Sequence, residues 1–401
     1  MFADEELDAA GEAAAVRRVH RELFARLAAE AAPHLEAGRQ REWIDRLLSD
    51  QDNLRAALDP PPGGEPADVA GRLRLAADLW RFWVARGQFG EGFERLEALL
   101  AADPGDDGAL RTRALHGAAT LAHNLGRNAC ARELLEEARA LCLAAGDEAA
   151  LLQVDNNLAW VALEMTDLGE GEARSRDGLE LARRRGDLRA QAVALNNLGF
   201  LAAYRERWDA AAEHHRASLE LRGRIHDRRG EAFARINLAW AERERGELET
   251  AAELLAEAET RLEEMGDRIL SIWAICHRAA LRRARGERGP PIVTAAVLAR
   301  AREVGNPSVV GELLLARSAE AAGGDDARRF AREAYEEFRG YGCPWGVGRG
   351  AARLAAVAED ASDGEAAVRW WREALTAAEA GGLACQAERA GRALSRLGVA
   401  P

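Results

Sequence analysis

The amino-acid sequence predicts an all-α protein, a solenoid of antiparallel helix hairpins with a repeat of about 40 residues. Composition is the first reason. Of the 401 residues, 48% are hydrophobic and only 5% are aromatic, and Ala, Leu, Arg and Glu dominate, which favours helix over strand. Length is the second reason, because 401 residues exceed one ordinary compact core, yet no change of composition marks a second fold. A repeat array escapes that size limit, since each unit packs only on its neighbours.

Internal repetition is the third reason. Glycine-aspartate dipeptides and close variants of them recur at intervals of 40, 40, 40 and 39 residues. They are Gly146-Asp147, Gly186-Asp187, His226-Asp227, Gly266-Asp267 and Gly305-Asn306. Three segments that contain asparagine, 156–159, 196–199 and 236–239, also lie 40 residues apart, each within an apolar stretch of helical spacing. Because two independent features share one period, they indicate a repeated structural unit.

One unit shows how each repeat should fold. Leu188 to about Arg205 has apolar residues at helical spacing, residues 207–209 should form a turn, and residues 210–224 form a second amphipathic helix. Small residues recur where the two helices of a hairpin must approach closely. They are Ala159, Gly199 and Ala239 on the first helix, and Ala131, Gly171, Ala211 and Ala251 on the second. A hairpin of this size cannot bury its apolar faces alone, so stacking on its neighbours should stabilise it.

The predicted organisation has three parts. Residues 1–58 should form an N-terminal helical pair, with helices over roughly 12–31 and 36–57. A linker rich in proline and glycine covers 59–66, and the solenoid occupies 67–401.

The repeats become less regular towards the C-terminus. Pro290-Pro291 interrupts the second helix of one hairpin, so that helix should start late, near Ile292. Further hairpins are predicted over 307–341 and 345–381, and a capping helix near 383–397 should close the array.

Charge and composition exclude several classes of function. The formal net charge of −12 works against direct binding to nucleic acid, whose phosphates require a basic surface. All 55 basic residues are Arg, so mechanisms that need a P-loop or Schiff-base lysine are excluded. No Ser-His-Asp order, paired-carboxylate signature or H-E-x-x-H motif is present. We therefore predict a protein that is not an enzyme and uses no cofactor, although a repeat fold that carries catalytic residues stays open as a third interpretation.

The cysteines and the termini indicate a cytoplasmic location. The five cysteines are scattered and odd in number, which does not suit a disulfide framework. They are Cys130, Cys142, Cys276, Cys343 and Cys385. The segment after Met1 is acidic where a signal peptide would be basic, and no apolar run approaches the roughly 20 residues that span a bilayer. We expect no contact with a membrane.

The repeat register separates structural positions from candidate binding positions. Asn157, Asn197 and Asn237 precede the packing leucine of each clear repeat, where a structural hydrogen-bonding side chain is expected. Other positions of the first helices should point along a concave groove. The predicted binding residues are Gln153, Asn156, Trp160, Asn196, Phe200, Tyr204, Trp240, Arg243 and Glu244. Their aromatic members could grip a ligand or an inserted peptide, or they could fill the space between successive first helices, and both interpretations stay open.

Three weaker patterns favour structural interpretations. His214 and His215 are neighbours on a helix and point about 100° apart, so they should face solvent and bind no metal. The glycine-rich segment 346–350 lacks the preceding strand and the following lysine of a phosphate loop, and should be a flexible helix start. Basic residues that could clamp a peptide carboxylate are missing from positions five and six of the first helices, which works against recognition of an acidic chain terminus.

The repeats resemble tetratricopeptide repeats, in which a large residue is followed by Asn-Leu-Gly, Gly-Asp at the turn and a small Ala in the second helix. Residues 194–199, Ala-Leu-Asn-Asn-Leu-Gly, and Ala211 match that pattern. The unit is longer than the roughly 34 residues typical of the family, and in this it resembles the sensory arms of MalT-like and AfsR-like STAND regulators. The resemblance implies a right-handed superhelical solenoid.

The N-terminal part resembles the stretch that joins the winged-helix end of a STAND ATPase core to its repeats. The segments that carry this likeness are 11–20, 31–35, 43–47, 52–58, 75–83 and 86–87. They include Trp43-Ile44-Asp45-Arg46-Leu47 and Leu79-Trp80-Arg81-Phe82-Trp83.

In such regulators, the repeat arm receives an inducer or a partner and releases a nucleotide-binding core to act on DNA. The resemblance therefore implies a non-catalytic sensor arm of a bacterial transcriptional regulator, with a protein, a peptide or a small-molecule inducer in the concave groove. A nucleotide-binding core would then belong to a longer parent chain. The alternative is a free-standing scaffold or adaptor for protein-protein interaction.

Overall fold

The computed structural model describes residues 12–35, 40–60, 68–321 and 324–400. Every regular element within these ranges is a helix, and adjacent helices pack as antiparallel hairpins, which confirms the predicted helical solenoid. The chain divides into two compact units, one of residues 1–122 and 133–147 and the other of residues 123–132 and 148–401.

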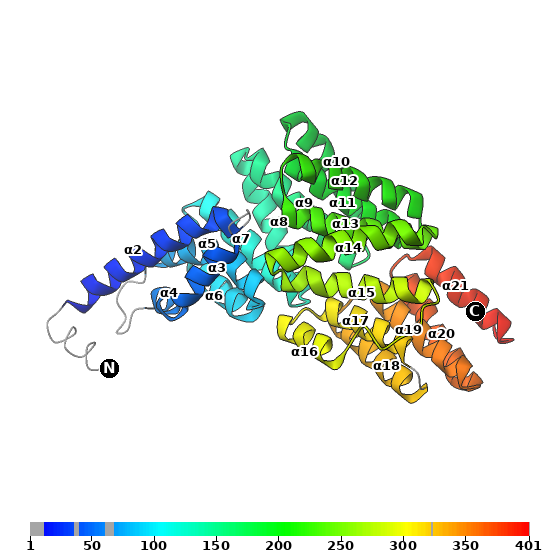
Figure 1. The fold of residues 1–401 in the computed structure, drawn as a ribbon. Coiled ribbons are helices and arrows are strands. Elements are labelled where there is room, and N and C mark those ends of the chain that lie inside the picture. The colour runs from blue at the N-terminus through cyan, green and yellow to red at the C-terminus, as the bar shows by residue number, and fades with distance from the viewer. Residues whose placement is uncertain (1–11, 36–39, 61–67, 322–323, 401) are drawn as a thin grey trace. The chain divides into compact units, whose positions relative to one another are not determined.

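The first unit contains the N-terminal helices and the earliest hairpins (Figure 1). Its elements are α2 (Ala13–Ala31), the 3-10 turn η1 (Ala32–Leu35), α3 (Gln40–Ser49), α4 (Gln51–Leu58), α5 (Val69–Arg86), α6 (Phe89–Ala102) and most of α7 (Gly108–Asn124) and α8 (Asn128–Ala145). The sequence predicts one helix over 36–57, but the chain forms α3 and α4. The reason is Asp50, which leaves the helical conformation with φ −108° and ψ 16°. Residues 61–66 of the predicted linker lie outside the described residues.

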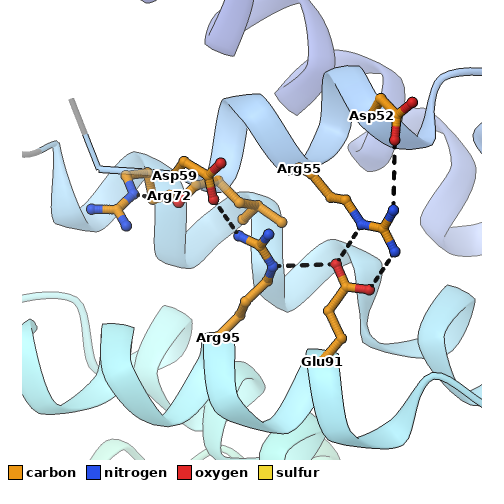
Figure 2. Close-up of polar contacts among 7 residues, drawn as sticks. Asp52, Arg55, Asp59, Arg72, Glu91 and Arg95 are labelled. Atoms are coloured by element: carbon orange, nitrogen blue, oxygen red, sulfur yellow. Dashed lines mark hydrogen bonds and ion pairs between the residues drawn. The ribbon is translucent and has the colours of Figure 1, made fainter. Parts of the chain in front are cut away.

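An arginine-carboxylate network holds α4 against α6 (Figure 2). Arg55 donates two hydrogen bonds to Glu91, at 2.8 Å from Nε and 2.7 Å from Nη2. Arg95 joins the same carboxylate to Asp59, which it meets at 2.9 Å. The hydrogen bonds from Arg55 lower the pKa of Glu91. Because bidentate pairs of this kind fix both partners, the network sets the position of α4, which has only eight residues.

The second unit contains six hairpins and a final helix (Figure 1). The hairpins are α9 (Glu148–Glu164) with α10 (Leu168–Arg185), α11 (Leu188–Tyr204) with α12 (Trp208–Arg224), α13 (Arg228–Arg245) with α14 (Leu248–Met265), α15 (Arg268–Ala284) with α16 (Ala295–Val304), α17 (Pro307–Glu320) with α18 (Gly324–Tyr341), and α19 (Pro344–Asp360) with α20 (Gly364–Ala380). Helix α21 (Ala384–Arg396) follows them. Below, the earlier helix of each pair is its first helix.

The repeating Gly-Asp dipeptide ends one helix and starts the next. Gly186 follows α10 in the left-handed conformation, with φ 69°, and the Asp187 carboxylate accepts a hydrogen bond from the Ala190 amide at 2.9 Å. A glycine in the left-handed conformation commonly ends a helix, and an aspartate commonly caps the N-terminus of the next helix. His226 takes the glycine position before Asp227 and tolerates φ 55°. The 40-residue period of these dipeptides therefore marks the boundaries between successive helices.

The turn between α11 and α12 lies at residues 205–207, slightly before the predicted 207–209. The chain reverses there because Glu206 adopts a positive φ of 55°. Within the hairpin, Gly199 allows close packing, since a Cβ at this position would lie 2.5 Å from the His215 ring. The prediction that His215 faces solvent is thus wrong. Its side chain is fully buried, and burial lowers its pKa to about 3, so the ring is neutral.

The proline segment before α16 is held by one carboxylate. Both oxygens of Glu320 accept backbone hydrogen bonds at 3.0 Å, from the amides of Ile292 and Val293. Helix α16 then begins at Ala295, after the N-cap Thr294, three residues later than the predicted start. Glu320 thus satisfies two amides of the segment that precedes the helix.

The glycines of segment 346–350 lie in the first two turns of α19, which confirms the predicted helix start, and they pack closely against α18. A Cβ at Gly346 would lie 2.2 Å from the Phe338 ring, and one at Gly350 would lie 2.9 Å from the Tyr335 Cα atom. The absence of side chains lets α18 and α19 approach closely enough to bury Phe338 completely. These glycines therefore serve the close packing of α18 and α19, a role that the sequence did not predict.

Candidate functional site

Aromatic side chains form a continuous row across the first helices of the second unit. The ring of Trp160 on α9 lies 4.9 Å from Phe200 on α11, and Phe200 lies 6.0 Å from Trp240 on α13. Trp240 in turn lies 6.0 Å from His277 on α15. We call these four residues together with Tyr204 the inner surface. Trp160, Phe200 and Trp240 are spaced by one repeat of 40 residues, which explains why the sequence could predict them.

The C-terminal hairpins pack onto this inner surface. Trp345 of α19 stacks on Tyr204, with ring centroids 4.6 Å apart and planes 4° from parallel, and its ring is 6.1 Å from Trp240. Leu383 and Ala378 belong to the same buried cluster as Tyr204 and Trp240. Trp160 and Phe200 are only partly buried. The inner surface is thus covered at its Tyr204 and Trp240 end.

A polar contact reinforces this closure between parts of the chain about 180 residues apart. Arg389 of α21 donates to both carboxylate oxygens of Glu206, at 2.7 and 2.9 Å. The Cys385 thiol lies 3.5 Å from the Arg205 carbonyl oxygen, to which it can donate. These contacts join α21 to the α11–α12 turn.

The asparagines hold successive first helices together. Asn197 donates to the backbone oxygen of Asn156 at 3.1 Å, and Asn237 donates to the side chain of Asn196 at 2.9 Å. The predicted structural role of Asn197 and Asn237 is confirmed. Asn156 and Asn196 were expected to point along a groove, but their exposed fractions are only 6% and 4%, and Asn196 also lies 3.2 Å from His215. These two residues lie in the packing between helices.

The remaining predicted residues differ in exposure. Gln153 and Glu244 are exposed, whereas Tyr204 is buried. Arg243 forms a short ion pair with Glu244, and its side chain is only 12% exposed. Burial is the largest cause that lowers the pKa of Arg243, and Arg349 adds to it. Its guanidinium thus lies in a site with little water, where a charge interacts strongly.

Sequence reasoning missed Glu164, which occupies the repeat position of Tyr204 and Glu244 one unit earlier. Its side chain is 6% exposed, and its Oε2 atom has no hydrogen-bond partner. Burial, and then the charge of Glu312, raise its pKa to about 7. The 40-residue period was a sufficient signal, because it places residue 164 with the two residues that were predicted.

Sequence reasoning also missed the contribution of α19. Arg349 forms a short ion pair with Glu312 of α17, and its guanidinium lies 4.2 Å from the centroid of the Trp345 ring. Arg353 donates to the hydroxyl and the carbonyl oxygen of Ser318, at 2.9 and 2.8 Å. No periodic signal could have found these residues, because α19 lies outside the regular repeats.

A separate hollow of about 610 Å³ lies between the α16–α17 junction and α18. It is lined by Arg302, Pro307, Arg332, Glu333, Glu336, Glu337, Gly340 and Tyr341. An ion pair of 3.0 Å between Arg302 and Glu333 already neutralises part of this lining. Over the described part of the chain, no group of three His, Cys, Asp or Glu side chains could hold a metal ion. None of the described helices is long and apolar enough to cross a membrane.

The middle repeats match a known family. Residues 190–264, which extend from α11 to α14, match the tetratricopeptide repeat. No curated protein matches the sequence. The fold and the stacked hairpins thus define a helical repeat protein with about 40 residues in each regular unit, whose residues 190–264 match tetratricopeptide repeats.

Several solved structures share the fold. A Rap protein in complex with Competence and Sporulation Factor has a TM-score of 0.65 at 12% identity, over 92% of this chain and 99% of that one. The Rap conjugation gene regulator of plasmid pLS20, in complex with the Phr* peptide, has a TM-score of 0.59 at 11% identity, over 80% and 96%. NprR in complex with its cognate peptide NprX has a TM-score of 0.54 at 12% identity, over 89% and 98%. At these identities the likeness shows the fold alone.

Proposed function

We propose that the inner surface binds a peptide or a segment of a partner protein, and that the chain is a non-catalytic sensor of a regulatory protein. The aromatic row carries this proposal. Trp160 and Phe200 are partly exposed on neighbouring first helices, and Arg243 lies one turn beyond Trp240 on α13. Aromatic rings give large contact area at a low cost in conformational entropy. Peptide complexes of Rap and NprR proteins with the same fold support the choice of a peptide.

A peptide fits this surface better than a small-molecule inducer does. The exposed parts of the row extend from α9 to α11, and successive first helices display the rings at similar spacing. An extended chain can contact several such positions at once. A compact inducer would cover Trp160 and Phe200 alone, whereas an extended chain can continue beyond these two rings.

For the wider role, we propose the sensor arm of a STAND-type transcriptional regulator of the cytoplasm. The support is the resemblance of the N-terminal segments, including residues 43–47 and 79–83, to the connector of such regulators. Signal binding on the arm would control a nucleotide-binding core in a longer parent chain, and this core, not the arm, would act on DNA. The alternative is a free-standing adaptor, which is supported by the same inner surface.

Selection from a phage-displayed library of random peptides on the full chain tests the binding proposal. Selected peptides should bind Trp160→Ala and Phe200→Ala at least about tenfold more weakly than the wild type, or ~1.4 kcal/mol. Trp370→Ala is the matched control, because this partly buried tryptophan packs on Tyr335, away from the inner surface. Far-UV circular dichroism should show equal helicity. Equal affinity of all variants, or a failure to select any peptide, would refute the proposal.

A further inference from the structure

Arginines from three helices gather beside the Trp240 end of the inner surface, although the chain as a whole carries a net charge of −12. Trp345, Arg349 and Arg353 follow one another at intervals of four residues on α19, so they share one face of that helix. The contact of Trp345 with Trp240 turns this face towards α13. Arg349 lies over the Trp345 ring and is therefore held in place.

Helices α13 and α15 complete the group. Arg243 lies three residues after Trp240 on the same face of α13, and α15, which packs on α13, contributes Arg283. Helix α15 also packs on α17, which carries Ser318, the partner of Arg353. Burial lowers the pKa of Arg243 and of Arg353, and the charge of Arg283 lowers both further. We call Arg243, Arg283, Arg349 and Arg353 the arginine group.

The arginine group is only partly neutralised. Arg243 pairs with Glu244, and Arg349 pairs with Glu312. Arg353 is bound to Ser318, which carries no charge, and its only nearby acid is Asp360, with which it makes no ion pair among the described residues. Arg283 is exposed and has no ion pair within the part of the chain that the structure describes. The charges of two of the four guanidiniums, Arg283 and Arg353, are thus not balanced by a carboxylate ion pair among the described residues.

We propose that the arginine group binds the carboxylate of an Asp or Glu side chain of the peptide that occupies the inner surface. This inference rests on the proposed function and names the chemistry that the bound segment must carry. Arginine presents a planar array of donors that matches a carboxylate, and such charge-assisted hydrogen bonds are stronger where little water is present. Stacking on Trp345 orders Arg349 before the ligand arrives. Positions five and six of the regular first helices α9, α11 and α13 lack basic residues, but these arginines come from other positions of α13 and α15 and from α19, which lies outside the regular repeats.

The test uses the same phage-displayed library on the full chain. Peptides selected by the wild type should be enriched in Asp or Glu, and replacement of the acidic residue by Asn or Gln should weaken binding about ten- to hundredfold. The variant Arg283→Gln with Arg353→Gln should bind the acidic and the amide peptide equally. Arg283→Gln alone, at an exposed position, should reduce the difference without any effect on folding.

The matched control is Arg184→Gln with Arg329→Gln, two exposed arginines that pair only with acids on their own helices. This control should keep the full preference for the acidic peptide. If peptides are selected without acidic enrichment, or if the Arg283 and Arg353 variants keep the preference, the arginine group is not the site, while peptide binding itself stands. If no peptide is selected, the proposed function fails and the inference fails with it.

Discussion

The middle repeats and the C-terminal hairpins of the second unit are built from helices of similar length but are stabilised differently. In α11 to α14, the same contacts return in both units, namely an N-cap aspartate on the first helix, an asparagine between first helices and small residues within each hairpin. In α17 to α20, the contacts occur once each. Phe338, for example, fills the space left by both Gly311 and Gly346.

In the middle repeats the stability is therefore spread over many similar contacts, whereas in the C-terminal hairpins it depends on a few single contacts. A repeated contact contributes a modest amount in each unit, so the loss of one leaves the others in place. A single aromatic side chain that two helices share has no such reserve. The C-terminal hairpins also cover the inner surface, so their stability bears directly on how that surface opens.

The largest expected effect is at Phe338. Phe338→Ala removes a fully buried ring and leaves a cavity that the glycines on α17 and α19 cannot fill, which should cost about 4 kcal/mol. Urea unfolding followed by circular dichroism measures the loss. The control is Phe233→Ala on α13. The Phe233 ring is only partly buried, so its loss should reduce the free energy of unfolding by less than half as much. Equal losses at the two sites would remove the distinction between the regions.

The next effect is at Glu164, where the two regions meet. Its carboxyl is approached by Glu312 from α17, by Tyr341 and Cys343 from the α18–α19 turn, and by Tyr204 from α11, and none of these groups is basic. The folded protein therefore favours the neutral acid, with a pKa near 7, while the unfolded chain has the ordinary value of 4.5. The contribution of the Glu164 carboxyl to the free energy of unfolding is fully present below about pH 4.5 and is lost as the pH rises through 7.

Glu164→Gln should abolish that part of the pH dependence. The variant should match the wild type near pH 4 and exceed it by about 3 kcal/mol at most near pH 8, because the amide cannot ionise. Unfolding free energies at a series of pH values measure the effect. If the unfolding free energies of Glu164→Gln and of the wild type changed in parallel with pH, Glu164 would not be the group that causes the loss of stability between pH 4.5 and pH 7.

The repeated contacts were predictable from sequence, and the single ones were not. The Gly-Asp dipeptides and the paired positions of Asn197 and Asn237 follow from local chemistry repeated at a fixed interval, so they predict the hairpins of the middle region. The same interval predicted the aromatic row. It did not predict whether the rings fill the space between successive first helices or bind a ligand.

The closure of the inner surface could not be predicted. The stacking of Trp345 on Tyr204 joins residues 141 positions apart, and the contact of Arg389 with Glu206 joins residues 183 positions apart. No repeated sequence pattern indicates either contact. Asn196 was misplaced for a related reason. Its groove position was deduced from one helix, but burial depends on His215 from the second helix and Asn237 from the next repeat.

The smallest effect tests the asparagine row. Asn237→Ala removes one buried hydrogen bond, but Asn196 keeps its contact with His215, so the cost should be about 1 kcal/mol. Asn197→Ala should cost about the same, because the carbonyl of Asn156 that it leaves lies within a helix. Urea unfolding of both single variants and of the double variant measures the two costs and their sum. The two bonds join different pairs of helices, so their costs should be nearly additive. A cost near that of Phe338→Ala at either asparagine would mean that the middle repeats also depend on a few critical contacts.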